Sequence, residues 1–373
     1  ALHIGSKDDE GVKRTVHTAV IICLAGGILI TVFGILFSHN ILALMNTKDE
    51  LIDGAVLYLR IYLLGMPALG LYNFGNAVLS AAGDTKRPPY YLAFAGVVNV
   101  ILNLFFVIVC HLGVAGVALA SMISQFISAF LILRALLTGK EKYCLRLSEI
   151  RFDKRKAVGI LQIGIPSAFQ YSLFAFANLF VQSSVNSFDH VLVEGNSAAA
   201  NADPLVYDMM AAFYTACSSF IAQNFGARKK KRILQTYLIC LFYSFITSLV
   251  LGVGIYLARY PFLYLFTSDK AVVEAGITRL SIMALSYSAS AFMDASIAAS
   301  RGLGKTAVPT FVVVMGSCVF RIIWIYTIFA YFHTIQSLYI LYVFSWGITA
   351  IAENIYFFHV YRHTLTGKTE SHL

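Results

Sequence analysis

The sequence predicts an all-α polytopic membrane protein built from two pseudo-symmetric helix bundles. Three observations lead to this fold class. The first is composition, because 58% of the 373 residues are hydrophobic and 13% are charged, with a mean hydropathy of +0.74. Soluble proteins contain about 45–50% apolar and about 25% charged residues. The second is a series of ten long apolar windows, and the third is an internal repeat at a shift of 221 residues.

The ten apolar windows are each long enough to cross a bilayer as a helix, which needs about 20 residues. They lie at 15–38, 55–82, 90–110, 114–137, 157–188, 200–225, 233–258, 273–300, 308–331 and 335–361. Their apolar residues do not alternate with polar ones, so helices are favoured over barrel strands.

The basic residues predict the topology. With loops assigned to alternate sides, 21 of the 28 Lys and Arg fall on one side, including Arg301 and Lys305, and 3 on the other. The positive-inside rule then places both termini in the cytoplasm. Arg279 lies toward an outer helix end, where we expect it to snorkel. The basic run at 227–232 is expected to contact anionic lipid headgroups, and no nucleic-acid partner is expected.

The internal repeat indicates a gene duplication. A shift of 221 residues places Gly5 on Gly226 and "GDTKRP" (83–88) on "GKTAVP" (304–309). Two apolar windows precede Gly226 in the second copy but not Gly5 in the first, so we expect ten transmembrane helices here of an original twelve. The predicted lobes are 1–150 (helices 3–6) and 151–373 (helices 7–12). Repeats of this kind, with equal orientation, are typical of alternating-access transporters.

A phosphate-loop interpretation of "ASRGLGKTAVP" (299–309) is disfavoured by the repeat. The first copy has Asp84 where the second has Lys305. A phosphate loop also follows a strand, whereas this motif follows a long apolar helix. We interpret both copies as turns, in which Gly83 and Gly304 end one helix and a proline begins the next.

Asp294 is the leading candidate for a functional residue, because an ionisable group at membrane depth is costly. Tyr287, Ser290 and Asp294 lie at i, i+3 and i+7 and share one helix face. The repeat pairs Asp294 with Asn73, so both lobes carry a polar group at the same depth. Burial disfavours the charged carboxylate, which could exchange H⁺ or Na⁺ for a cationic substrate. The alternative is a structural ion pair with Arg321.

Amide side chains form a second candidate set. Gln170, Asn178, Gln182 and Asn186 are spaced by multiples of four in the fifth apolar window. Amides would be unfavourable against lipid, so we expect them to face a cleft or another helix. Asn103 is a weaker candidate in the third window.

Motifs for catalysis or metal binding are not found in the sequence. The six cysteines are scattered, without a C-x-x-C pair, and no nucleophile elbow or His/Asp cluster occurs. We therefore expect no enzyme, no metal site and no cofactor other than a coupling ion.

Five stretches resemble the multidrug and toxic compound extrusion (MATE) family. They are "GNAVLSAAGDTKRP" (75–88), residues 99–125, "IGIPSAFQYSLFAFANLFVQSSVNSF" (163–188), "FIAQNFGARKKKR" (220–232) and "MDASIAASRGLGKTAVP" (293–309). The resemblance implies an antiporter in the plasma membrane, the bacterial inner membrane, that exports small organic cations in exchange for H⁺ or Na⁺. We expect the protein to be a monomer in the lipid bilayer. The family often has Asp where this chain has Asn103.

Three other functions compete with this one. A lipid-linked oligosaccharide flippase of related fold would need a cationic cleft, for which Arg321 is the one candidate and which Asp294 opposes. A truncated remnant that does not transport is the second alternative. A membrane enzyme is the third, and the lack of motifs disfavours it.

Overall fold

A computed structural model describes residues 1–44 and 49–364, and those residues form helices and short connections, with no strand among them. The chain divides into two compact units, one of residues 7–160 and one of residues 1–6 and 161–373. We call them the N-terminal and C-terminal units and describe each by itself. The boundary between them falls inside α7 (Lys154–Val185).

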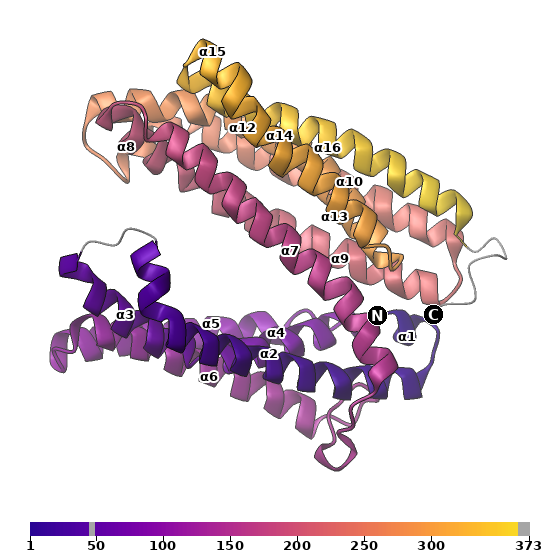
Figure 1. Ribbon diagram of the computed structural model, residues 1–373. Coiled ribbons are helices and arrows are strands. Elements are labelled where there is room, and N and C mark those ends of the chain that lie inside the picture. The colour runs from indigo at the N-terminus through magenta and orange to yellow at the C-terminus, as the bar shows by residue number, and fades with distance from the viewer. Residues whose placement is uncertain (45–48, 365–373) are drawn as a thin grey trace. The chain divides into compact units, whose positions relative to one another are not determined.

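The N-terminal unit contains five long helices (Figure 1). They are α2 (Asp9–Leu44), α3 (Asp49–Leu63), α4 (Met66–Ala81), α5 (Arg87–Leu104) and α6 (Gly113–Thr138), with the π-helical η1 (Phe105–Val109) extending α5 and the short 3₁₀ helix η2 (Leu147–Glu149) following α6. The connection after α6 is tied to α2, because the Asp153 amide donates to Thr18 and Lys13 pairs with Glu149 at 2.5 Å. The hydrogen bond from Lys13 lowers the pKa of the Glu149 carboxyl.

The C-terminal unit contains the remaining helices, and all of them except the indigo α1 run from magenta to yellow in Figure 1. Besides α1 (Leu2–Gly5) and most of α7, they are α8 (His190–Ala200), α9 (Ala202–Gly226), α10 (Lys230–Leu257), α11 (Arg259–Tyr264), α12 (Lys270–Gly302), α13 (Ala307–Val313), η3 (Val314–Val319), α14 (Phe320–Trp324), η4 (Ile325–Phe329), α15 (Ala330–Phe332) and α16 (Ile335–His363). The elements from α13 to α15 follow one another without a break and together make one span.

The predicted membrane spans are confirmed by the helices. Within the described residues, nine helices are long and apolar enough to cross a membrane, or ten when α3 and α4, bent by 43° at residues 64–65, count as one. Each of the ten predicted windows coincides with one of them. α12 is the central helix of the C-terminal unit, since 67% of its most apolar window is buried compared with 6% for α2.

The internal repeat is visible in the backbone of each unit. Lys7 and Arg228, 221 residues apart, both have positive φ, at 59° and 55°. Gly83 and Gly304 do the same at 94° and 76°, directly after α4 and α12. Glycine adopts such angles without the steric cost that a Cβ brings. The predicted helix-ending role of both glycines is therefore confirmed. The π-helical segments η1 and η4 also match within one residue under the same shift.

The phosphate-like motif at 299–309 forms the turn that the repeat predicts. It follows α12, and the Lys305 amide donates to the Ser300 carbonyl at 3.0 Å. The Thr306 hydroxyl donates to the Gln162 carbonyl at 3.1 Å, while the Lys305 side chain is exposed. The motif thus joins two helices and makes no phosphate cradle.

Gly252 allows α10 to approach α12 closely. A Cβ at Gly252 would lie 1.9 Å from the Ala284 carbonyl oxygen, which belongs to the α12 backbone. We expect Gly252→Ala to lower the free energy of unfolding by about 1–3 kcal/mol through overpacking. The measurement is thermal unfolding of the purified protein in detergent. Gly254→Ala is the matched control, since a Cβ there meets no atom within 4 Å. Equal stability of the two variants would contradict the close approach.

Candidate functional site

A cavity of about 680 Å³ lies inside the C-terminal unit, among α7, α8, α9, α12, α14 and α16. Its wall carries five charged and four amide side chains: Asp203, Arg279, Asp294, Arg301, Arg321, Gln170, Asn178, Gln182 and Asn196. Aromatic residues, including Tyr207, Tyr214, Tyr342 and Trp346, make up much of the rest. The cavity therefore combines apolar rings with charged groups that could orient a small molecule.

Arg279 and Asp203 form a buried ion pair at one side of the cavity. The Arg279 guanidinium donates to the Asp203 carboxylate at 2.6 Å, and the side chain of Arg279 is 7% exposed. Tyr287 also donates to Asp203, and the Asn196 carbonyl accepts from Arg279 at 3.4 Å. The expectation that Arg279 snorkels to the surface is wrong, because a carboxylate on α9 satisfies its charge inside the unit.

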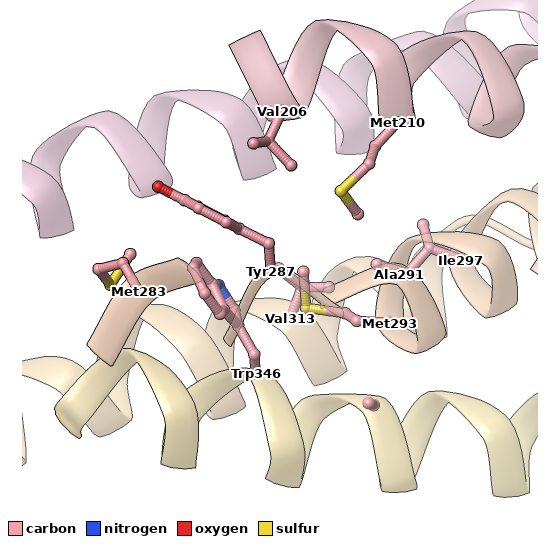
Figure 2. Packing of buried hydrophobic residues seen from close by; sticks show 10 residues of the cluster. Val206, Met210, Met283, Tyr287, Ala291, Met293, Ile297, Val313 and Trp346 are labelled. Carbon is pink, nitrogen blue, oxygen red and sulfur yellow. The ribbon is translucent and has the colours of Figure 1, made fainter. Parts of the chain in front are cut away.

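Tyr287 is held in the apolar packing that supports this pair. Figure 2 shows Tyr287 of α12 and Trp346 of α16 side by side, with Val206 and Met210 of α9 facing them. The ring centroids of Tyr287 and Trp346 are 6.4 Å apart. Tyr207 meets both rings edge-on. Because Tyr287 is fully buried, its hydroxyl is fixed toward Asp203.

Arg321 is a buried cation without a carboxylate partner. Its guanidinium donates to the Asn178 amide oxygen at 2.9 Å and to the Ser345 hydroxyl at 3.3 Å. It also lies 4.5 Å from the ring centre of Tyr342 and 5.3 Å from that of Phe174. No carboxylate in the described part of the chain lies within 4.0 Å of it. Amide, hydroxyl and aromatic groups therefore hold a full positive charge in place.

Arg301 lies in the last turn of α12 and faces the cavity. Its guanidinium donates to the Tyr214 hydroxyl at 2.6 Å and to the Gln170 amide oxygen at 2.8 Å. Its assignment to a loop together with Lys305 is therefore wrong, because Arg301 still belongs to α12. The turn begins only after Gly302, and the long Arg301 side chain reaches α7 and α9 instead.

Asp294 lines the cavity and has no hydrogen-bond or ion-pair partner among the described residues. The alternative of a structural ion pair with Arg321 is wrong, because Arg321 donates to Asn178 and Ser345 instead. The guanidinium of Arg301 is the charged group that acts on Asp294 electrostatically. Asp294 is thus a carboxyl group at membrane depth that is available to a guest in the cavity.

The other predicted site residues of the C-terminal unit fall into two groups. Gln170, Asn178 and Gln182 line the cavity with Asp294. Tyr287 and Ser290 are buried behind its wall, where Ser290 donates to the Tyr287 carbonyl at 2.9 Å.

The predicted N-lobe residues belong to the N-terminal unit. Asn73 is exposed on α4, and the Asn103 amide donates to Asn99 at 3.1 Å. A binding role for any of the eight candidates stays a prediction.

Three charged residues of the cavity wall were not among the predicted site residues: Asp203, Arg279 and Arg301. The helical stripe that contains Tyr287 and Asp294 continues in both directions to Arg279 and Arg301, since all four fall within about 80° on the helix. Extending the stripe by two turns each way would have found both arginines. Asp203 carries no such signal, because an acidic residue in the first turn of a helix is ordinary.

Groups of three or more His, Cys, Asp or Glu that could hold a metal ion do not occur in residues 1–44 and 49–364. The cavity wall presents hydrogen-bonding, ionic and aromatic side chains.

Solved structures with the same fold are membrane transporters. A MOP superfamily transporter from Pyrococcus furiosus superimposes with a TM-score of 0.91 at 21% identity, covering 97% of this chain and 81% of the other. A variant of the Vibrio cholerae MATE transporter VcmN superimposes with a TM-score of 0.89 at 19% identity, with coverages of 97% and 82%. The fold is therefore that of the MATE transporters.

Family membership follows from the sequence match. The MatE family model matches residues 1–105 and 166–327. The chain belongs to the MatE family, the multidrug and toxic compound extrusion family.

Three curated relatives are similar over large parts of the chain. The probable multidrug resistance protein YoeA of Bacillus subtilis is 28% identical over 76% of this chain and 63% of its own length. The probable multidrug resistance protein YpnP of the same organism is 30% identical, with coverages of 61% and 51%. A protein of Shewanella oneidensis named as an FAD transporter is 23% identical, with coverages of 73% and 61%. The chain thus spans about half to two thirds of the length of these relatives.

Proposed function

We propose that the protein is a secondary active antiporter that exports small organic cations in exchange for H⁺ or Na⁺ by alternating access. Membership in the MatE family and the multidrug resistance relatives support the general class. The observation that carries the proposal is the unpaired carboxyl of Asp294 on the wall of an aromatic-lined cavity.

The cavity explains how one carboxyl could couple two cations. An organic cation and a coupling ion cannot neutralise Asp294 at the same moment, so binding of one favours release of the other. Tyr207, Tyr214 and Tyr342 offer ring faces to an organic cation. The amides Gln170, Asn178 and Gln182 could accept or donate hydrogen bonds to substrates of varied shape. No covalent step is part of this function.

The same proposal predicts where the protein lies and how it is oriented in the membrane. The protein would lie in the plasma membrane as a multi-pass monomer with both termini in the cytoplasm, in contact with the lipid bilayer. The basic clusters near residues 140–156 and 228–232 would then face the anionic cytoplasmic leaflet.

A second candidate is export of substrates that carry an anionic group. With Asp203 and Arg279 paired, the remaining charges of the cavity wall are one carboxylate, Asp294, and two guanidiniums, Arg301 and Arg321. Two cations without a carboxylate partner favour a carboxylate or phosphate on the guest. The relative named as an FAD transporter fits this candidate. A flippase would need a cationic cleft, and the cavity wall offers Arg301 as well as Arg321 for it.

One experiment with a matched pair of dyes tests both candidates. The probes are an aminoxanthene dye with a free carboxylate and the methyl ester of the same dye, which is a cation. The full-length protein is reconstituted in liposomes with an imposed H⁺ or Na⁺ gradient, and dye movement is followed by fluorescence. We expect gradient-driven transport of the ester. Transport of the free acid alone would favour the second candidate, and transport of neither dye under either gradient would contradict both.

A further inference from the structure

Cys217 of α9 and Cys240 of α10 form a pair of free thiols away from the cavity. Cys217 is 1% exposed, Cys240 is half-buried, and neither residue lines the cavity. A hydrogen bond joins the two thiols. The residues are far apart in the sequence and belong to different helices, so their spacing did not indicate a pair. The proposed antiport uses neither thiol.

The geometry of the two helices brings the thiols to the same level. Because α9 and α10 are joined only by residues 227–229, they run antiparallel to each other. Cys217 lies nine residues before the end of α9, and Cys240 lies ten residues after the start of α10. At a rise of 1.5 Å per residue, both lie about 14–15 Å from the turn. Nearer the turn, the Asn224 amide donates to the Thr236 hydroxyl at 3.5 Å, in agreement with this register.

Apolar packing holds the two sulfur atoms in place. Both residues belong to one cluster, in which Cys217 is a buried member and Cys240 packs against the buried members. The Cys217 thiol also donates to the Ala295 carbonyl of α12 at 3.8 Å. A disulfide requires two Cβ atoms about 3.5–4.5 Å apart, so two thiols that already touch are close to the geometry of the bond.

The two thiols differ in their access to the surroundings. Cys240 is partly exposed and lies among exposed apolar side chains of α10, including Ile239 and Phe242. Since α10 is a membrane span, these side chains would face lipid. Cys217 is closed off behind them. An accessible thiol beside a second one is the arrangement of an attacking and a resolving cysteine.

We propose that Cys217 and Cys240 form an oxidation site, which an organic hydroperoxide dissolved in the bilayer converts to a disulfide. The Cys240 sulfur attacks the peroxide oxygen that carries hydrogen, and the O–O bond breaks. The alkoxide leaves as an alcohol with the thiol proton, and Cys240 becomes a sulfenic acid. The Cys217 sulfur then attacks the Cys240 sulfur, so that an S–S bond forms and an S–O bond breaks. Hydroxide leaves as water with the Cys217 proton, and two electrons have passed from the thiols to the hydroperoxide.

The disulfide would fasten α9 to α10 one turn from a cavity residue. Tyr214 precedes Cys217 by three positions and accepts a hydrogen bond from Arg301. α10 is itself packed closely on α12 at Gly252. The bond would therefore hinder movement of α9 against α10 and α12, and the oxidised protein would transport more slowly. This consequence rests on the proposed antiport function, whereas formation of the disulfide does not.

The test treats the full-length protein in liposomes with cumene hydroperoxide, a lipophilic hydroperoxide. Remaining thiols are alkylated, and mass spectrometry of the digest identifies the peptides joined by a disulfide. The melting temperature is measured before oxidation, after it, and after reduction by a phosphine. The matched control is Cys318→Ser, which changes a buried cysteine that is hydrogen-bonded to no other cysteine in the described part of the chain.

We expect a peptide that joins Cys217 to Cys240 in the wild type and in Cys318→Ser. The melting temperature should rise by a few degrees and return after reduction, because the bond constrains the unfolded chain. Cys217→Ala should leave a sulfenic acid on Cys240 that dimedone traps, and Cys240→Ala should leave Cys217 as a thiol. If the wild type forms no such peptide, the proposal is overturned, and this result does not depend on the folding of any variant.

Two further measurements separate the parts of the proposal. Hydrogen peroxide at equal concentration should form the disulfide more slowly than cumene hydroperoxide, and a faster reaction would contradict access from the lipid. Dye transport should be slower in the oxidised than in the reduced protein, and equal rates would contradict the hindered movement of α9. A protein that forms the disulfide but transports no dye when reduced would count against the antiport function alone.

Discussion

Asp294→Asn is expected to abolish gradient-driven export of a cationic dye. The amide keeps the size of the side chain but can neither carry a negative charge nor bind a proton at neutral pH. Since Asp294 has no hydrogen-bond or ion-pair partner among the described residues, the change removes charge from the cavity wall without breaking a contact. We measure dye accumulation in cells and dye movement in proteoliposomes. Export by Asp294→Asn should fall to the level of controls that contain no transporter.

The control for Asp294→Asn is a second aspartate of the same unit. Asp208 is exposed on α9 and does not line the cavity, so Asp208→Asn should export dye as the wild type does. Both variants should be expressed equally and melt within a few degrees of the wild type. Export by Asp294→Asn at the wild-type rate would show that coupling does not depend on this carboxyl.

The spans and turns could be predicted from sequence because their causes are local. A window of apolar residues specifies a transmembrane helix by itself, and a glycine after a helix specifies where that helix ends. Gly83 and Gly304 illustrate this, since both adopt the positive φ that their sequence context predicts. The fold class and the spans could be predicted from the sequence for the same reason, and the repeat could be read directly from matching residues.

The partners of the charged residues could not be predicted, because they depend on packing between distant helices. Arg279 looked like a snorkelling residue near a helix end, yet its carboxylate partner Asp203 comes from α9. Arg301 looked like a loop residue, yet it binds Tyr214 and Gln170. The residue pattern of one helix does not indicate which residues of another helix its side chains will contact.

α12 unites the features on which the functional proposals depend. One stripe of this helix carries Arg279, Asp294 and Arg301 along the cavity, with Tyr287 buried behind the wall. The helix is also the most buried of the described spans. A small shift of α12 would therefore change the ion pair at Arg279 and the surroundings of Asp294 together, which is the kind of coupling that the proposed antiport would need.

The Asp203–Arg279 pair should show strong coupling in a double-mutant cycle. Arg279→Met leaves Asp203 among apolar side chains with Tyr287 as its remaining donor, and Asp203→Leu leaves a guanidinium that is 7% exposed without its carboxylate. Breaking a buried pair from one side costs about 3–5 kcal/mol, whereas replacing both partners by apolar groups is often neutral. Asp203 is 24% exposed toward the cavity, so the lower end of that range is expected.

Thermal unfolding of the two single variants and the double variant measures this coupling. The double variant should be more stable than either single variant, because neither charge is then left alone. Glu194→Gln is the control, since it disrupts the exposed contact with His190 and such pairs contribute about 0–1 kcal/mol. Additive losses in the double variant would mean that the two charges are stabilised separately, by Asn196 and Tyr287, and that the ion pair does not hold α9 against α12.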